Sequence, residues 1–514
     1  MNRHLRTAHP TVLPIAIPLL STLLLAGCEV GPNFEPPAAP PGAGYTQEQP
    51  ANPIATTDVK TGTAQQFAVG RDIQGEWWTL FHSEVLNRLV QRALQANPNV
   101  DAAQAALRQA RENAYAGEGA LFPSASASFQ PERARISGAS FGQPKLSETL
   151  SLVTAQLNVS YALDLWGGTR RQIESLNAQA EYQRFELEAT YLTLSSNVVA
   201  AAINEASLRG QIAATEQIIK ADADQLELVR KQFAIGSASR ADLLTQQATL
   251  AQVRATLPPL RKQLAQQRNQ LAALAGGFPS QELDARFDLA GLQLPADLPL
   301  SLPSQLVEQR PDVRAAEAQF HAASANLGVA IANQLPQFSI TGMLGSETLG
   351  FTNLFTPATG VWSIAAGITQ TLFDAGTLLH KKRAAAAGLE QAAAQYRGTV
   401  ITAFQNVADA LRALQFDADT LHEQAAAEKA ASDSLALARV QFQAGALSYL
   451  NLLNADRTWQ QSRVALVQAE AARFADTAAL FQALGGGWWH RSDVAADANG
   501  PDHLTPPLAA ALQP

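Results

Sequence analysis

The feature that most constrains the fold of this chain is an internal duplication that occupies most of the sequence after residue 80. The run Asn-Pro-Asn-Val at 97–100 recurs as Arg-Pro-Asp-Val at 310–313. A segment around Gly236 recurs around Gly445, 209 positions later, and the motifs follow in the same order in both copies. A repeat of this kind means that the chain is two copies of one structural unit, so its fold has to be built twice.

Each copy predicts two strands after its first helix. Small and polar residues alternate with larger ones at 124–135 and 150–163, and again at 337–349 and 358–371. This alternation is typical of strands with one face toward lipid and one toward water. Four strands cannot close a barrel, and open sheet edges are not tolerated in lipid. Three chains would supply twelve strands, so we expect a homotrimer.

Each strand pair is followed by a long segment with little glycine or proline, which predicts helical hairpins over 168–275 and 376–484. In the first arm, residues such as Tyr182, Phe185 and Ala189 recur at steps of three and four. That spacing is close to a 3.5-residue period and predicts coiled-coil packing.

The turn of each hairpin has a local cause. A glycine ends the first arm in the left-handed conformation, a serine three positions later caps the returning helix, and a side chain three positions beyond stands near the capping-box position. These residues are Gly236, Ser239 and Asp242 in the first copy, and Gly445, Ser448 and Asn451 in the second.

The N-terminus is typical of a secretory signal with a lipid attachment site. A basic flank precedes an apolar run of about 15 residues, which is shorter than the roughly 20 that a spanning helix needs. The run Leu-Ala-Gly-Cys at 25–28 matches the bacterial lipoprotein box. The match implies cleavage before Cys28, a diacylglycerol on its sulfur and an acyl group on its nitrogen. Glu29, which follows, favours the outer membrane.

Composition restricts the kinds of partner that this chain can bind. The formal net charge of −8 argues against nucleic acid, whose phosphates require patches of Lys and Arg. Cys28 is the only cysteine, so no disulfide forms within the chain. We expect a signal at 1–27, a lipidated extended segment at 28–80, a first repeat at 81–279, a linker at 280–304, a second repeat at 305–487 and a tail at 488–514.

These motifs together resemble the outer-membrane factors, the TolC-type ducts of tripartite export systems, and most closely their lipoprotein branch, labelled NodT. The matching features are Cys-Glu-Val-Gly-Pro-Asn-Phe-Glu-Pro-Pro at 28–37, Glu-Trp-Trp-Thr-Leu-Phe at 76–81, the two helix starts and the two glycine tips. The resemblance covers nearly all of the mature chain. It departs at 82–84 and in the tail after Leu484.

The resemblance implies a mainly α protein with a membrane β-barrel, in which a homotrimer completes a 12-stranded barrel above a helical tunnel. It implies no cofactor, no metal and no catalysis. Such a duct passively conducts small molecules from an inner-membrane pump of the resistance-nodulation-division (RND) class, through a periplasmic adaptor that meets the hairpin tips, to the outside. A type I protein-secretion channel is the alternative within this class, and a non-conducting coiled-coil envelope lipoprotein is the alternative outside it.

The resemblance also implies an acidic gate, because family members carry acidic rings near the periplasmic constriction. Asp224 and Asp433 each lie twelve positions before a tip glycine and are the candidates, with Asp222 and Glu428 as nearby competitors. In a trimer, Asp224 and Asp433 would place six carboxylates around one axis, which favours cations. The other interpretation is a solvated acid on the outer face of each helix.

An enzyme is the least favoured function. The run Gly-Ala-Ser-Phe-Gly at 138–142 matches a nucleophile elbow, but it falls in a predicted loop between two strands instead of a strand-to-helix turn. The histidines of the mature chain are scattered and show no metal-binding spacing.

Overall fold

The computed structural model of this chain describes residues 29–39, 44–48, 51–54, 57, 59, 62–137, 139, 142, 147–281 and 283–491. Cys28 and the signal at 1–27 lie outside the described residues, and so does the predicted tail beyond Arg491.

Two compact units make up the chain, and each is discontinuous in sequence. The first contains the chain up to Pro36, Leu107–Tyr182 and Ala316–Gln395, and the second contains Pro37–Ala106, Gln183–Ala315 and the chain from Tyr396. The boundaries 81–279 and 305–487 therefore describe a duplication of sequence and not two separate bodies. Each unit combines matching parts of both copies, because the strands of the two copies share one sheet.

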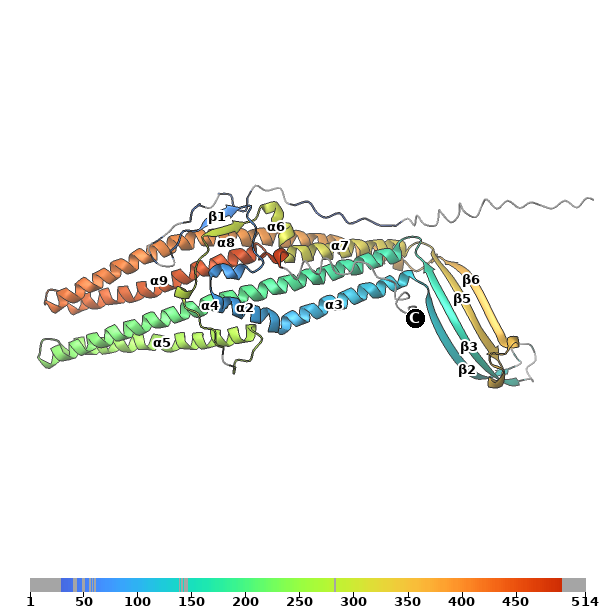
Figure 1. The fold of residues 1–514 in the computed structure, drawn as a ribbon, viewed down its shortest axis with the longest axis horizontal. Coiled ribbons are helices and arrows are strands. Elements are labelled where there is room, and N and C mark those ends of the chain that lie inside the picture. The colour runs from blue at the N-terminus through green and yellow to red at the C-terminus, as the bar shows by residue number, and fades with distance from the viewer. Residues whose placement is uncertain are drawn as a thin grey trace, which may run out of the picture. The chain divides into compact units, whose positions relative to one another are not determined.

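The first unit contains a four-stranded antiparallel sheet whose strands lie side by side (Figure 1). Its strands, in the order in which they pair, are β2 (Ser124–Ser137), β3 (Ser147–Leu163), β5 (Gln337–Thr348) and β6 (Gly360–Thr369). The central pair, β3 with β5, joins one copy of the repeat to the other.

Strand bounds differ from the predicted ones at the outer ends. β2 and β3 continue past 124–135 and 150–163, because their pairing runs on until Ser137 lies opposite Ser147. β6 is shorter than the predicted 358–371, because Pro357–Thr359 forms a turn of 3-10 helix and pairing ends where Thr369 meets Gln337.

The predicted helical hairpins are confirmed. They consist of α4 (Gly168–Ala234) with α5 (Arg240–Leu274), and α8 (Thr377–Gln443) with α9 (Tyr449–Ala483). The first arm has 67 residues and the second 35 in both copies, so the duplication is kept in the lengths of the elements.

Two shorter helices precede the strands in each copy. They are α2 (Glu84–Ala96) and α3 (Pro98–Glu118) in the first copy, and α6 (Pro303–Gln309) and α7 (Pro311–Ala332) in the second. Pro98 and Pro311 open the second helix of each pair, where the missing N–H has no helical partner to lose. Among the described residues, no helix has an apolar stretch long enough to cross a bilayer.

The breaks between these short helices bind the ends of the returning arms. The Asn97 side chain donates to the carbonyl of Leu274 at 2.9 Å. In the second copy Arg310 donates to the carbonyl of Ala483 at 3.0 Å. Both acceptors lie at the C-terminal end of a hairpin, where carbonyls lack helical partners. The two copies therefore close the same joint with different side chains.

A glycine follows each of these joints for a steric reason. Gly276 has φ +75°, and an added Cβ would overlap the carbonyl oxygen of Ala96. Gly485, its counterpart, has φ +92°, and its Cβ would lie 2.5 Å from the carbonyl oxygen of Gln309. Positive φ and contact with rigid backbone exclude larger residues at both positions.

The predicted extended segment 28–80 and linker 280–304 each contain a strand that the sequence analysis missed. β1 (Gln66–Val69) pairs in parallel with β4 (Asp297–Leu300). Each strand has only four residues, which is too few for an alternating pattern to be recognised, and the partners are more than 200 residues apart.

Aromatic side chains form the centre of the second unit. Trp77 and Phe81 are fully buried, with ring centroids 6.4 Å apart. Trp77 also lies 5.6 Å from Phe481, and Phe81 lies 6.3 Å from Phe474. The residues before the first repeat are thus packed against the last helix of the second one.

The first residues of the predicted tail 488–514 belong to the same unit. The Trp488 indole donates to the carbonyl of Gln309 at 2.7 Å and packs edge-on against Phe185 at 5.8 Å. Arg491 forms an ion pair with the buried carboxylate of Glu188 at 2.9 Å. The described end of the chain is therefore part of the core packing.

We expect Gly276→Ala and Gly485→Ala each to lower the free energy of unfolding by roughly 1–3 kcal/mol, because each forces a side chain into a left-handed residue that faces a carbonyl. Thermal denaturation of the purified protein measures this. Gly398→Ala is the control, since an added Cβ there meets open space within α8 and should be neutral or slightly stabilising. An unchanged Tm for both joint variants would contradict the steric account.

Candidate functional site

One face of the sheet is apolar and exposed. Its large side chains lie opposite one another on neighbouring strands: Leu157 of β3 is paired with Leu344 of β5, and Leu344 is paired with Trp362 of β6. The exposed members are Phe129, Leu157, Val159, Ile340, Leu344, Trp362, Ile364 and Ile368. A continuous exposed apolar face of this size marks a surface that contacts something other than water.

The opposite face of the same sheet is mainly polar, although it also carries Leu150, Leu152, Met343 and Val361. It carries the side chains that alternate with the apolar ones along each strand: Ser126, Ser128, Gln156, Asn158, Ser160, Ser339, Thr341 and Ser363. Strands that alternate in this way face lipid on one side and a polar interior on the other. The predicted two-faced strands are therefore present, and they bring both copies of the repeat into one surface.

Both outer strands of the sheet have an unpaired edge within the described part of the chain. β2 pairs with β3 alone and β6 with β5 alone. In a bilayer each unsatisfied backbone group costs several kcal/mol, so open edges do not occur in the hydrocarbon region. The sheet is therefore complete only when strands from other chains pair with β2 and β6.

The first hairpin turns as its sequence predicts. Gly236 has φ +77°, and the N–H of Ser237 donates to the carbonyl of Gln232 at 2.8 Å, which closes the end of α4. Ser239 caps α5, because its hydroxyl accepts from the N–H of Asp242 at 3.1 Å. The Asp242 carboxylate accepts from the N–H of Ser239 at 3.0 Å, which completes the capping box.

The second hairpin repeats the turn with a weaker cap. Gly445 has φ +74°, and the N–H of Ala446 donates to the carbonyl of Gln441 at 2.9 Å. The Ser448 hydroxyl accepts from the N–H of Asn451 at 3.4 Å. No return bond from the Asn451 side chain accompanies it among the described contacts, so this tip is held by fewer polar bonds than the first.

The candidate gate residues are exposed in the single chain. Asp224 lies on α4 and Asp433 on α8, both on solvent-facing positions before their tips. Of the two competitors, Glu428 is half-buried and lies 3.7 Å from Arg463. Asp222 is buried, with 2% of its surface exposed, so it is not a solvated ring residue in this chain.

Asp222 instead forms a buried carboxyl pair with Asp456 of α9, which the sequence analysis missed. Gln460 donates to both carboxyl groups, and its bonds to Asp222 measure 3.3 and 3.4 Å. Arg439 of α8 lies 3.6 Å from Asp456. Gln246 of α5 donates to the carbonyl of Asp222 at 3.2 Å and accepts from the hydroxyl of Tyr449. The pair thus joins the two hairpins near their tips.

Two carboxyl groups in this setting hold a proton at pH values where a free aspartate has lost it. Burial, together with the negative charge of Asp456, raises the pKa of Asp222 to about 7. Burial also raises the pKa of Asp456. Because the two groups interact, they titrate as a pair.

We expect the pair to make stability pH-dependent. The folded chain binds a proton that the unfolded chain releases near pH 3.8, so the pair's contribution is full at acid pH and is lost as pH rises toward 7. Asp222→Asn keeps a neutral, hydrogen-bonding group, so its Tm should fall less between pH 5 and pH 8 than that of the wild type. Asp224→Asn, an exposed neighbour on the same helix, should follow the wild type. Parallel curves for all three proteins would contradict the shared proton.

Within the described residues, no group of three or more His, Cys, Asp or Glu side chains is arranged to hold a metal ion. Most of the nucleophile-elbow run at 138–142 lies outside the described residues, so that motif stays an expectation from sequence.

Comparison with known proteins gives a consistent result. The model of the outer membrane efflux protein family matches residues 89–277 and 302–486, one match in each copy of the repeat. The chain is 29% identical to a toluene efflux pump outer membrane protein, TtgC of Pseudomonas putida, over 93% of this chain and 96% of that protein. It is 31% identical to the pyoverdine export outer membrane protein OpmQ of Pseudomonas aeruginosa, over 80% and 87%.

Among solved structures, the outer-membrane channel OprN superposes with a TM-score of 0.80 at 25% identity, over 90% of this chain and 100% of that one. The residues that match the family model include both strand pairs and both hairpins. The chain belongs to the outer membrane efflux protein family.

Proposed function

We propose that this chain forms, as a homotrimer, the exit duct of a tripartite efflux pump, and that it passively conducts small molecules across the outer membrane. The observation that carries the proposal is the sheet with one lipid-type face, one polar face and two open edges. Three copies supply twelve strands. The eight strands of two copies would also close, but around an interior that side chains fill, so twelve is the smallest multiple of four that leaves room for a passage. Outer-membrane placement itself follows from family membership.

Small-molecule cargo is favoured over protein secretion. The relative TtgC is named for the efflux of toluene, which is a small apolar molecule. The polar face of the sheet carries serines, threonines and amides, a lining that gives little basis for choosing one solute. We therefore expect the pump and not the duct to select the cargo. The type I secretion channel stays the alternative.

The two hairpin tips are proposed as the contact with a periplasmic adaptor, which links the duct to an inner-membrane pump of the RND class. Large apolar side chains stand exposed at both tips: Ile235 is 81% exposed and Leu450 is 63% exposed. Gly236 and Gly445 have open space around them, so neighbouring elements of the same chain do not cover the turns. An exposed apolar turn with fixed capping geometry suits a helical partner.

Two further parts of the proposal follow from the sequence. Cys28 carries the lipid that anchors the mature chain in the outer membrane, and the duct needs no cofactor beyond that covalent lipid. Asp224 and Asp433 line the periplasmic end as an acidic ring that favours cations. Their exposure in the single chain is compatible with both this role and a solvated outer position.

Single-channel recording in a planar bilayer tests the duct and the ring together. We expect low, cation-selective conductance from the mature trimer. Asp224→Ala/Asp433→Ala should raise the conductance or reduce the selectivity, because six carboxylates are lost.

The matched control is Glu227→Ala/Glu423→Ala, which removes exposed acids from the same two helices. Equal behaviour of the gate variant and the wild type would discard the acidic ring and keep the duct. A verified trimer without conductance would overturn the duct and favour a tethering lipoprotein.

A further inference from the structure

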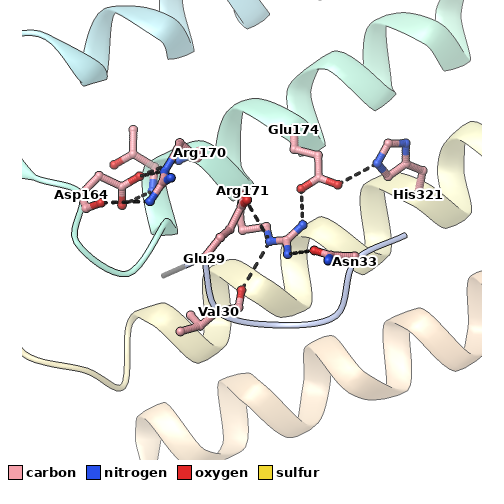
Figure 2. A network of polar contacts seen from close by, with 9 residues as sticks. Glu29, Val30, Asn33, Asp164, Arg170, Arg171, Glu174 and His321 are labelled. Atoms are coloured by element: carbon pink, nitrogen blue, oxygen red, sulfur yellow. Dashed lines mark hydrogen bonds and ion pairs between the residues drawn. The ribbon is translucent and has the colours of Figure 1, made fainter. Parts of the chain in front are cut away.

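Residues 29–34 lie against the junction between β3 and α4, within the first unit (Figure 2). The N–H of Val30 donates to the carbonyl of Trp166 at 3.1 Å. An ideal Cβ on Gly167, which has φ +74°, would lie only 3.0 Å from the Cα of Glu29. The segment is therefore packed directly on the turn where the strand becomes a helix.

A single buried guanidinium binds this segment. Arg171 of α4 has 3% of its surface exposed. Its Nη2 donates to the side-chain oxygen of Asn33 at 2.6 Å, and its Nε donates to the carbonyl of Val30 at 3.3 Å (Figure 2). Its Nε also lies 3.5 Å from the Glu29 carboxylate, and its Nη1 donates to Glu174 at 2.7 Å. Charge-assisted bonds of this kind are stronger than neutral ones.

A second set of contacts extends the clamp to α7. The other oxygen of Glu174 lies 2.8 Å from Nε2 of His321, whose ring stacks on Phe34 at 4.4 Å and 14°. Phe34 also packs edge-on against Phe320 at 5.3 Å. Burial raises the pKa of Glu174, but the bonds from Arg171 and His321 outweigh it and leave that pKa below its ordinary value. Glu174 therefore stays ionised opposite the buried Arg171.

Two glycines allow this close approach. An ideal Cβ on Gly31, which has φ +98°, would lie 2.6 Å from the Cα of Gly328 in α7. A Cβ on Gly328 would in turn lie 2.9 Å from the Cγ of Arg171. The segment, the helix and the arginine stem are thus stacked without room for a methyl group between them.

The second copy of the repeat lacks the arginine of this clamp, although the joint that the clamp sits on is present in both. Asp164 accepts from the N–H of Thr169 at 3.0 Å and caps α4, and Asp374 accepts from the N–H of Leu378 at 2.7 Å and caps α8. When Gly-Thr at 168–169 is aligned with Gly-Thr at 376–377, Leu379 takes the place of Arg171. Starting the helix therefore does not require Arg171.

The junction also carries the exposed apolar residues expected where a barrel meets the polar edge of a bilayer. Leu372 and Phe373, which follow β6, are 93% and 89% exposed. Leu165 and Trp166 are the corresponding apolar pair of the first copy, one residue closer to the start of their helix. Large apolar and aromatic side chains favour the membrane–water interface.

We propose that Arg171 is a positioning residue for the lipid anchor. It clamps residues 29–34 to the end of β3, so that the acyl chains on the adjoining Cys28 enter the bilayer level with the strand ends. This inference rests on the proposed lipidation of Cys28. The anchor and the barrel then sit in register, and the peptide between them has little freedom to move. Lysine would be a poorer residue at this position, because only the planar guanidinium of arginine can donate to several acceptors in different directions at once.

The test uses a glutamate-specific protease on the acylated trimer in detergent, because Glu29 lies within the clamped segment and supplies a native cleavage site before Val30. Glu35 supplies none, because Pro36 follows it and such proteases do not cut a Glu-Pro bond. Cleavage of a closed segment follows the population of its open form. We expect Arg171→Gln to be cut about ten-fold faster than the wild type after Glu29, and Arg171→Lys to be cut at an intermediate rate. Arg170→Gln is the control, because Arg170 contacts Asp164 and not the segment.

Asn33→Ala removes a partner from the segment without touching a helix, and it should also speed cleavage if Arg171→Gln fails to fold. Equal rates for the wild type, Arg171→Gln and Asn33→Ala would overturn the clamp, and so would equal acceleration by Arg170→Gln. The mass of the released peptide reports acylation separately. An unmodified Cys28 would overturn the anchor role and the proposed lipidation, whereas the relative cleavage rates would still decide whether the clamp exists.

Discussion

The unpaired backbone edges of β2 and β6 determine the rest of this structure. A sheet with an exposed apolar face has to leave water, yet each unpaired N–H or C=O at its edges is costly in hydrocarbon. Pairing with strands of neighbouring chains meets both demands. A stable place in the bilayer therefore requires that these edges be paired. The long hairpins α4–α5 and α8–α9 are carried into the same assembly, because they continue directly from the strands.

The duplication supplies two strand pairs and two hairpins from one type of structural unit. Comparison of the two copies shows which features the fold requires. Both keep arm lengths of 67 and 35 residues, a left-handed glycine at the tip, a serine cap and a glycine pressed against a carbonyl at the returning end. Features without a counterpart at the matching position of the other copy stand out against this background. Arg171 and the Asp222–Asp456 pair are of this second kind, and both join parts of the chain that the duplication alone does not bring together.

The sequence predicts the elements that depend on local patterns. The strands follow from the alternation of side chains, and the tips follow from glycine, serine and a capping side chain at fixed spacing. The sequence does not predict the pairing of β1 with β4, the two compact units or the Asp222–Asp456 pair. Each of these depends on contacts between residues more than 100 positions apart, which leave no periodic signal. Asp222 and Asp224 show why the sequence alone could not identify the pair. They lie two positions apart on one helix, yet the carboxyl group of Asp222 is buried and that of Asp224 is exposed.

The most direct test of this account is the number of chains in the membrane-inserted particle. Native mass spectrometry of the protein released from lipid nanodiscs counts them without labels. We expect three chains, because twelve strands pair every edge of the sheet and leave an open interior, whereas the eight strands of two chains would close around side chains alone. A stable inserted particle of one or two chains would contradict it, since β2 and β6 would then face lipid unpaired or the barrel would close with fewer than twelve strands.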